Sequence, residues 1–293
     1  MSTRVLPEFT LIVPPTLEAA IAILAERPEQ SRILAGGTDM LVEMKCHDRG
    51  SETLVKISRL AELNFITYES ARGLAIGALT TIRAIADSSA LKQNYPLMLD
   101  AARDFANIQI MNMGTIGGNV CNASPAGDFL PCLLAMNAEV VLQSAAEQRT
   151  VKLSEFFTGP RKSQIRPGEI VVAITAPALS TLHSSAFVRF TRTAEDLAKV
   201  SAAVVLCIDD GKFSDIRIAL GSVAPTPIRV LEAEDFLKDQ AVTDAVISKA
   251  AKIVQSGIKP ISDLRSTADY RTDITGVAFK QAIAIALARR NIQ

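Results

Sequence analysis

The chain has 293 residues, 48% of them apolar, and 31 Lys plus Arg balance 31 Asp plus Glu. This length suggests about two domains with substantial cores, and the balanced charge gives no electrostatic support for nucleic-acid binding. The longest apolar runs, residues 202–208 and 282–288, are too short to span a membrane, and the N-terminal residues contain no apolar signal core. We therefore expect a cytoplasmic globular protein without a nucleic-acid or membrane partner.

The first half of the chain alternates between short strands and helices. Apolar spacing predicts, in order, strand 9–13, helix 17–24, strand 33–35, helix 40–46, strand 54–57, a hairpin of strands 65–68 and 74–78, and helices 81–88 and 96–105. The passage 107–128 is too polar and too often interrupted by glycine for an ordinary helix. A helix at 130–136 and strands at 138–143 and 170–175 complete this half.

After a linker at 177–185, the second half contains a compact sheet and then helices. Strands are predicted at 186–191, 200–208 and 216–223, and Asp209-Asp210-Gly211 closes a hairpin between the last two. Helices are predicted at about 233–237, 244–254 and 276–290. The order of these elements is typical of an α+β arrangement.

The cysteines and histidines exclude several kinds of site. The four cysteines are scattered and form no C-x2-C pair, which argues against a zinc or iron–sulfur site, and we expect reduced thiols. The two histidines, His47 and His183, form no zinc-protease motif. A Ser-His-Asp triad stays open but has no G-x-S-x-G motif to support it.

A first glycine loop follows the strand at 33–35. Its residues are Leu34, Ala35, Gly36, Gly37, Thr38, Asp39 and Met40. Consecutive glycines between a strand and a helix can expose several backbone N–H groups in one concavity, which suits a diphosphate. The spacing matches neither a Rossmann fingerprint nor a P-loop, and a purely structural turn is the alternative.

A second glycine loop, residues 112–128, combines four glycines with hydroxyl, amide and carboxylate side chains. Apolar Ile116, Val120 and Cys121 are interleaved with these groups, as in a loop partly buried against a large ligand. Its main chain could hold phosphate oxygens, and its hydroxyls with Asp128 could take sugar or ribityl hydroxyls. An ordinary polar connection is the alternative.

The two loops together resemble a known family. Ala35-Gly36-Gly37-Thr38-Asp39 and Thr115-Ile116-Gly117-Gly118-Asn119 look like the two FAD-binding signatures of the flavoprotein subunit of molybdenum hydroxylases, which include xanthine dehydrogenase, aldehyde oxidase and carbon monoxide dehydrogenase. Further similar pieces are Ile76-Gly77-Ala78-Leu79-Thr80-Thr81, Ala123-Ser124-Pro125, Glu169-Ile170-Val171, Asp196-Leu197-Ala198, residues 217–227 and Asp269-Tyr270-Arg271. Their order and spacing make the resemblance specific over nearly the whole chain.

The resemblance implies a vanillyl-alcohol-oxidase-type (PCMH) FAD-binding fold of two subdomains, followed by a C-terminal α+β flavoprotein domain. We expect the FAD-binding domain at residues 1–177, with subdomains of about 1–58 and 59–177, and the C-terminal domain at 178–293.

The resemblance also assigns residues to non-covalent FAD. Residues 34–40 would wrap the diphosphate, and Thr115, Gly117, Gly118 and Asn119 would form a second wall. Ser124 and Asp128 match positions near the hydroxyl-bearing chain of the cofactor. Phe105 and Val171 match positions that pack on an aromatic ring, although each could be simple core. Cys121 falls close to the isoalloxazine, where we interpret it as a packing residue.

The sequence departs from the family pattern at several positions. Met111 and Met113 stand where many relatives have arginine, so a phosphate or partner contact is in doubt there. Val188 stands where some relatives carry lysine, and the adjacent Arg189 could substitute for it. Because neither histidine lies in the two loops, covalent histidyl attachment of the flavin is not expected.

The function implied by the resemblance is electron relay. Electrons would pass from a large molybdopterin-binding subunit, through two 2Fe–2S clusters on a small subunit, to FAD on this chain, and then to NAD+, oxygen or a quinone. A heterotrimer, paired into a dimer of heterotrimers, is expected. Glu195 and Asp196 are candidates for tuning the flavin edge, with a solvated acidic turn as the alternative. The rival functions are a free-standing FAD oxidase of the same fold superfamily and a non-enzymatic homologue with an empty site.

Overall fold

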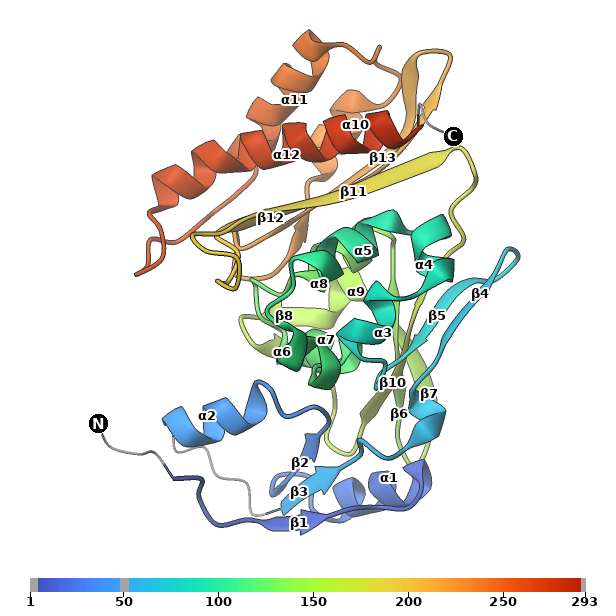
Figure 1. Cartoon of the computed structure of the whole chain (residues 1–293), viewed down its shortest axis with the longest axis vertical. Coiled ribbons are helices and arrows are strands. Elements are labelled where there is room, and N and C mark those ends of the chain that lie inside the picture. Colours follow the sequence, from blue (N-terminus) through green and yellow to red (C-terminus); the bar gives the residue numbers. More distant parts are fainter. Residues whose placement is uncertain (1–4, 48–52, 291–293) are drawn as a thin grey trace.

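Three main sheets, each covered by its own helices, organise the computed structural model, which describes residues 5–47 and 53–290 (Figure 1). The first sheet is parallel, with strand order β1-β3-β2. Its elements are β1 (Thr10–Ile12), α1 (Leu17–Glu26), β2 (Ser31–Leu34), α2 (Met40–His47) and β3 (Thr53–Lys56). Helix α1 begins after Thr16, whose hydroxyl accepts a hydrogen bond from Ala19 N at 3.2 Å. Its buried apolar stripe packs against β3 and β10 (Ile170–Ala176).

The second sheet is antiparallel, with order β4-β5-β10-β6-β7. Its other strands are β4 (Ile66–Glu69), β5 (Gly73–Gly77), β6 (Glu139–Gln143) and β7 (Gln148–Lys152), and a short helix η1 (Ala61–Leu63) precedes it. Its helices are α3 (Ile82–Ala86), α4 (Ser89–Asn94), α5 (Pro96–Arg103), α6 (Ile108–Met113), α7 (Ile116–Asn122) and α8 (Phe129–Ala135). After β7, α9 (Leu153–Phe156) leads into a small hairpin, β8 (Phe157–Gly159) and β9 (Lys162–Ser163).

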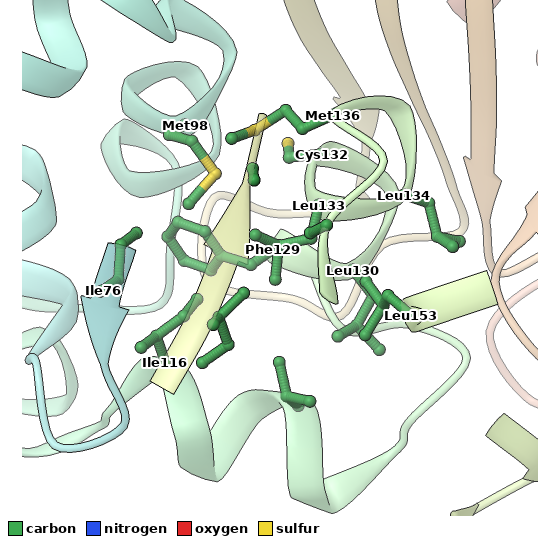
Figure 2. Packing of buried hydrophobic residues seen from close by; sticks show 14 of the residues in the cluster. Ile76, Met98, Ile116, Phe129, Leu130, Cys132, Leu133, Leu134, Met136 and Leu153 are labelled. Atoms are coloured by element: carbon green, nitrogen blue, oxygen red, sulfur yellow. The ribbon is translucent and has the colours of Figure 1, made fainter. Parts of the chain in front are cut away.

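The hydrophobic core of this second unit includes the first residues of α7 and α8. Figure 2 shows the fully buried Phe129 of α8 among Ile76, Met98 and Ile116, which come from β5, α5 and α7. Burial of such side chains contributes about 1.5–3 kcal/mol each. The start of α7 and the start of α8 are therefore fixed relative to the sheet by apolar packing.

The third sheet is antiparallel, with order β11-β12-β13-β14. It contains β11 (His183–Phe190), β12 (Val200–Asp209), β13 (Lys212–Gly221) and β14 (Ile228–Arg229). The helices α10 (Leu231–Leu237), α11 (Asp244–Ser256) and α12 (Ala268–Arg290) cover one face, and α5 and α8 lie against the other (Figure 1). Asp210 and Gly211 have φ of 45° and 70°, so the tight turn expected between β12 and β13 is present.

Several sequence expectations need correction. Residues 107–128 contain two short helices, α6 and α7, where no ordinary helix was predicted. Side-chain caps explain them: Asn107 Oδ1 accepts from Ile110 N at 3.0 Å, and Thr115 Oγ1 accepts from Gly118 N at 3.0 Å. Helix α12 begins at Ala268 rather than 276, and the linker ends earlier than expected because β11 begins at His183. Elements α4, β7, α9, β8, β9 and β14 were not predicted.

Among the described residues, no helix is long and apolar enough to cross a membrane.

Candidate functional site

A cleft lies between the first sheet and helices α6 and α7. It consists of two adjoining cavities of about 190 and 310 Å³. Both are lined by Arg32, Ile33, Ala35, Met40, Gly118 and Cys121, so they form one continuous space. In Figure 1, α2 faces α6 and α7 across this region. The cleft therefore lies where segments far apart in the sequence approach each other.

The first glycine loop forms one wall of the cleft. Residues 35–40 all line the first cavity, whereas Leu34 ends β2 and does not line it. Gly37 has φ +75°, a left-handed conformation that glycine adopts without strain. A Cβ on Gly36 would overlap the backbone oxygen of Met113. The first loop thus touches the end of α6 directly, and only glycine permits this approach.

The second glycine loop forms the opposite wall. Gly117 N donates to Ala78 O at 2.9 Å, and Ile116 N donates to Thr80 O at 3.0 Å, which fixes the start of α7 to the chain after β5. Thr115, Gly118, Asn119 and Cys121 line the first cavity, and Gly117 lines the second. The structure therefore brings the two glycine loops together.

The two predicted ring-packing residues lie in different parts of the cleft. Phe105 lines the first cavity, and its ring centroid is 5.7 Å from that of Phe129. Val171 lines the second cavity beside Ile170, on β10. An elongated ligand could contact both.

Asp128 and Arg189 form a buried pair beside the cleft. Arg189 Nη1 donates to Asp128 Oδ2 at 3.0 Å, and Arg189 Nη2 donates to the backbone oxygen of Asp104, next to Phe105. Burial raises the pKa of Asp128 to about 6, although the Arg189 guanidinium acts in the opposite direction. Neither residue lines the two cavities. That Arg189 substitutes for a cation near the cofactor therefore stays a prediction.

Other expected residues lie at or near the site in different roles. Ser124 Oγ accepts from Ala126 N at 3.3 Å and lies outside the cavity lining. Glu195, in the loop after β11, accepts from Asn107 Nδ2 at 3.4 Å, and Asp196 pairs with Arg192 at 3.1 Å. This loop is therefore attached to the residue that caps α6.

Cys121 lines both cavities. The residue is exposed at the cleft, while the protein packed around its sulfur raises the pKa of the thiol, so the thiol stays protonated at neutral pH. A neutral thiol favours the interpretation of Cys121 as a packing residue. His183 lies elsewhere, between Ser180 and Asp215.

Sequence reasoning missed several residues of the cleft. Arg32, Ile33, Glu43, Gly114 and Asn122 line the first cavity. Arg32 and Ile33 directly precede the first loop, and Glu43 follows it by one helical turn, so their proximity to the loop was the available signal. At the second cavity, residues 165–168 carried no comparable signal, whereas Glu169 and Ile170 belong to a segment that resembles the family.

Two buried oxygen atoms test whether the site suits a polar ligand. Asn119 Oδ1 and Asp128 Oδ1 are buried and have no hydrogen-bond partner. Unpaired buried polar atoms are rare and costly, and they often mark a site that a ligand or water completes. The first glycine loop packs so closely on the facing backbone that a Cβ at Gly36 would overlap it. This close main-chain packing and the two unpaired oxygen atoms fit an extended, polyhydroxylated, phosphate-bearing molecule such as FAD. Among the described residues, no group of three or more His, Cys, Asp or Glu side chains could hold a metal ion.

Comparison with family models covers most of the chain. Residues 7–179 match the FAD binding domain in molybdopterin dehydrogenase, and residues 185–286 match the CO dehydrogenase flavoprotein C-terminal domain.

Individual relatives match over nearly their full length. The glyceraldehyde dehydrogenase medium chain of Sulfolobus acidocaldarius is 34% identical, over 94% of this chain and 98% of that protein. The carbon monoxide dehydrogenase medium chain of Hydrogenophaga pseudoflava is 32% identical, over 97% of this chain and 98% of that protein. The xanthine dehydrogenase FAD-binding subunit of Escherichia coli O157:H7 is 33% identical, over 93% of this chain and 94% of that protein.

The structural comparison agrees. Carbon monoxide dehydrogenase from Hydrogenophaga pseudoflava superimposes with a TM-score of 0.94 at 33% identity, over 97% of this chain and 99% of that one. The expected fold class, a PCMH-type FAD-binding domain with a C-terminal flavoprotein domain, is confirmed.

Proposed function

Because this chain belongs to the family of FAD-binding subunits of the molybdenum hydroxylases, which contains those of carbon monoxide dehydrogenase and xanthine dehydrogenase, we propose that it relays electrons through FAD between a partner chain and a terminal acceptor. The observation that carries this proposal is the junction of the two glycine loops, where the backbone of Met113 occupies the space that a Cβ on Gly36 would need. Loops this close can hold one dinucleotide between their main chains.

The proposal gives each wall of the cleft a role. Residues 34–40 hold the diphosphate through backbone N–H groups, and Thr115, Gly117, Gly118 and Asn119 form the facing wall. Phe105 and Val171 pack on the rings, with Cys121 beside them. Ser124, Asp128 and Arg189 support the hydroxyl-bearing chain, where the unpaired Asp128 Oδ1 can accept a hydrogen bond from a hydroxyl group.

The cofactor supplies the redox chemistry, since flavin accepts electrons singly and can release two together. The protein binds and orients it without a covalent bond. The buried Asp128–Arg189 pair joins β11 of the C-terminal unit to this end of the cleft. Glu195 accepts a hydrogen bond from Asn107, the residue that caps α6, and Gly114 at the other end of α6 lines the first cavity. We propose that Glu195 and Asp196 influence the electrostatic environment of the flavin edge from this position.

We infer that the complete enzyme needs two further chains. Relatives at 34% and 32% identity are named medium chains, which supports a large molybdopterin-binding subunit and a small 2Fe–2S subunit as partners here. A dimer of such heterotrimers is the assembly that we propose. NAD+, oxygen or a quinone would accept the electrons. Cys121, Cys132 and Cys207 carry free thiols, which favours a reducing compartment such as the cytoplasm.

Purification of the full chain tests the proposal. We expect a yellow protein whose flavin is released intact by acid precipitation and can be identified as FAD. An artificial reductant should bleach it anaerobically, and NAD+, oxygen and a quinone should then be offered separately for reoxidation. Substrate turnover should require co-purified partner chains. A protein that stays colourless after addition of FAD would contradict the assignment, and substrate oxidation by this chain alone would favour a free-standing oxidase.

A further inference from the structure

Arg161 lies in the turn of the β8–β9 hairpin and is attached to the second glycine loop. Its backbone N donates to the backbone oxygen of Ala123 at 3.0 Å, and Ala123 is the residue that ends α7. The position of Arg161 is therefore fixed by the same helix whose first turn lines the cleft.

The side chain of Arg161 crosses to the opposite side of the cleft. Its guanidinium forms an ion pair with Glu43 Oε1 on α2, and the other carboxylate oxygen of Glu43 lies 3.5 Å from Arg32 Nη2. Glu43 lines the first cavity, and its side chain is only 17% exposed. This pair thus joins the helix that follows the first glycine loop to a hairpin attached to the second.

The charges around the first cavity show why a further cation is needed. Among the described residues, its lining contains the carboxylates of Asp39 and Glu43 and the guanidinium of Arg32. Burial raises the pKa of Asp39, and the charge of Arg161 acts against that rise. A diphosphate in this cavity would be repelled by the two acidic side chains. Positive charges nearby are required to offset this repulsion.

The backbone of Arg161 is strained. Its φ is +56°, in the left-handed region where glycine and asparagine are favoured and a long side chain is disfavoured. Strain of about 1–2 kcal/mol at such a position persists only where the surrounding fold enforces it, here through the hydrogen bond from Arg161 N to Ala123 O. The exposed neighbour Lys162 has no such backbone constraint.

From these observations we propose that Arg161 is a positioning residue for the dinucleotide: its guanidinium clasps α2 across the cleft through Glu43 and balances the acidic side chains beside the diphosphate. This inference rests on the proposed function, because it assumes that FAD occupies the cleft. It predicts that Arg161 governs how long FAD stays bound rather than how stably the chain folds.

Substitution by a residue that suits the left-handed backbone separates these two effects. Arg161→Asn and Arg161→Gly should release FAD about threefold to tenfold faster at low salt, measured by the rise of flavin fluorescence after dilution. Their melting temperatures without FAD should stay equal to or exceed that of the unsubstituted chain, because strain is relieved. Lys162→Gln, which removes the same charge at the next residue, should leave the release rate unchanged.

Charge reversal and salt provide the second test. Arg161→Glu, which adds a further carboxylate near Asp39 and Glu43, should release FAD faster than Arg161→Asn does, and 0.5 M salt should reduce the difference between Arg161→Asn and the unsubstituted chain. Equal release rates for Arg161→Asn, Lys162→Gln and the unsubstituted chain would overturn the inference while leaving FAD binding intact. Failure of the unsubstituted chain to bind FAD would instead overturn the proposed function, and the inference with it.

Discussion

Arg189 and Asp128 form a buried ion pair across 61 residues of sequence, with Nη1 and Oδ2 3.0 Å apart and the side chains 4% and 9% exposed. Arg189 comes from β11 of the C-terminal unit, and Asp128 precedes α8 of the FAD-binding unit. The same guanidinium binds the backbone beside Phe105. The pair therefore holds the C-terminal unit against one end of the cofactor cleft.

Loss of the guanidinium should be strongly destabilising. In Arg189→Gln, Asp128 keeps its burial but loses its ion-pair partner, and we expect the free energy of unfolding to fall by about 3 kcal/mol. Denaturant unfolding of the full chain measures this change. Arg192→Gln, which removes a guanidinium that is 69% exposed three residues later, should change stability by less than about 0.5 kcal/mol. Equal effects of the two substitutions would contradict the importance assigned to the buried pair.

The Asp128 carboxyl should also give stability a specific pH dependence. Burial raises its pKa from an ordinary value of 3.8 to about 6, so between these values the folded chain binds more protons than the unfolded chain. The contribution of this group to the free energy of unfolding therefore falls as pH rises through this interval, by up to about 1.4 kcal/mol per pH unit.

The difference in unfolding free energy between the unsubstituted chain and Asp128→Asn, measured at several pH values, isolates this contribution. From pH 4 to pH 6, the free energy of unfolding of the unsubstituted chain should fall relative to that of Asp128→Asn. Above about pH 7 the difference between the two should stay constant. A flat difference throughout would show that Asp128 titrates as an ordinary carboxyl.

Gly117 should tolerate no side chain. A Cβ there would lie 2.6 Å from Ala78 O and 2.7 Å from Ala78 Cβ, so Gly117→Val must displace the start of α7 from the end of β5. We expect loss of FAD, measured as loss of visible flavin absorption in the purified protein. In Gly159→Ala the nearest atom would be 3.9 Å away, and flavin content should be unchanged. A Gly117→Val protein that stayed yellow and fully reducible would show that this loop does not hold the cofactor.

A half-buried ion pair between Arg289, 30% exposed, and the buried Asp100 should control the attachment of the C-terminal unit. Arg289 of α12 donates to both carboxylate oxygens of Asp100 on α5 at 2.7 Å, and Phe187 N donates to the same carboxylate at 3.1 Å. Arg289→Gln leaves Asp100 with a buried charge and should cost about 3 kcal/mol. Limited proteolysis should then cut residues 177–182 faster. Arg290→Gln, next in sequence, removes a guanidinium that donates to a backbone oxygen, that of Leu182, rather than to a buried carboxylate, and should cost less stability.

Much of the secondary structure followed from local pattern. The apolar stripe of Leu17, Ala20, Ile21 and Leu24 predicted α1, because a helix places these spacings on one buried face. The Asp209-Asp210-Gly211 turn predicted the β12–β13 hairpin, because it supplies the required left-handed conformations. The passage from 107 to 122 was misjudged, because two capping side chains and tertiary burial of Ile116 outweighed the low helix propensity of its glycines.

The sequence alone identified the two glycine loops and the family that they resemble, because backbone freedom and close approach are properties of glycine itself. Which charged groups meet was decided by tertiary structure. Glu43 could pair with Arg161, and Asp128 with Arg189, only after α2, the β8–β9 hairpin and β11 were brought together by burial of their separate apolar faces. Hydrophobic periodicity specifies which face of an element is buried, but it carries no information about which distant ionic side chain will lie opposite.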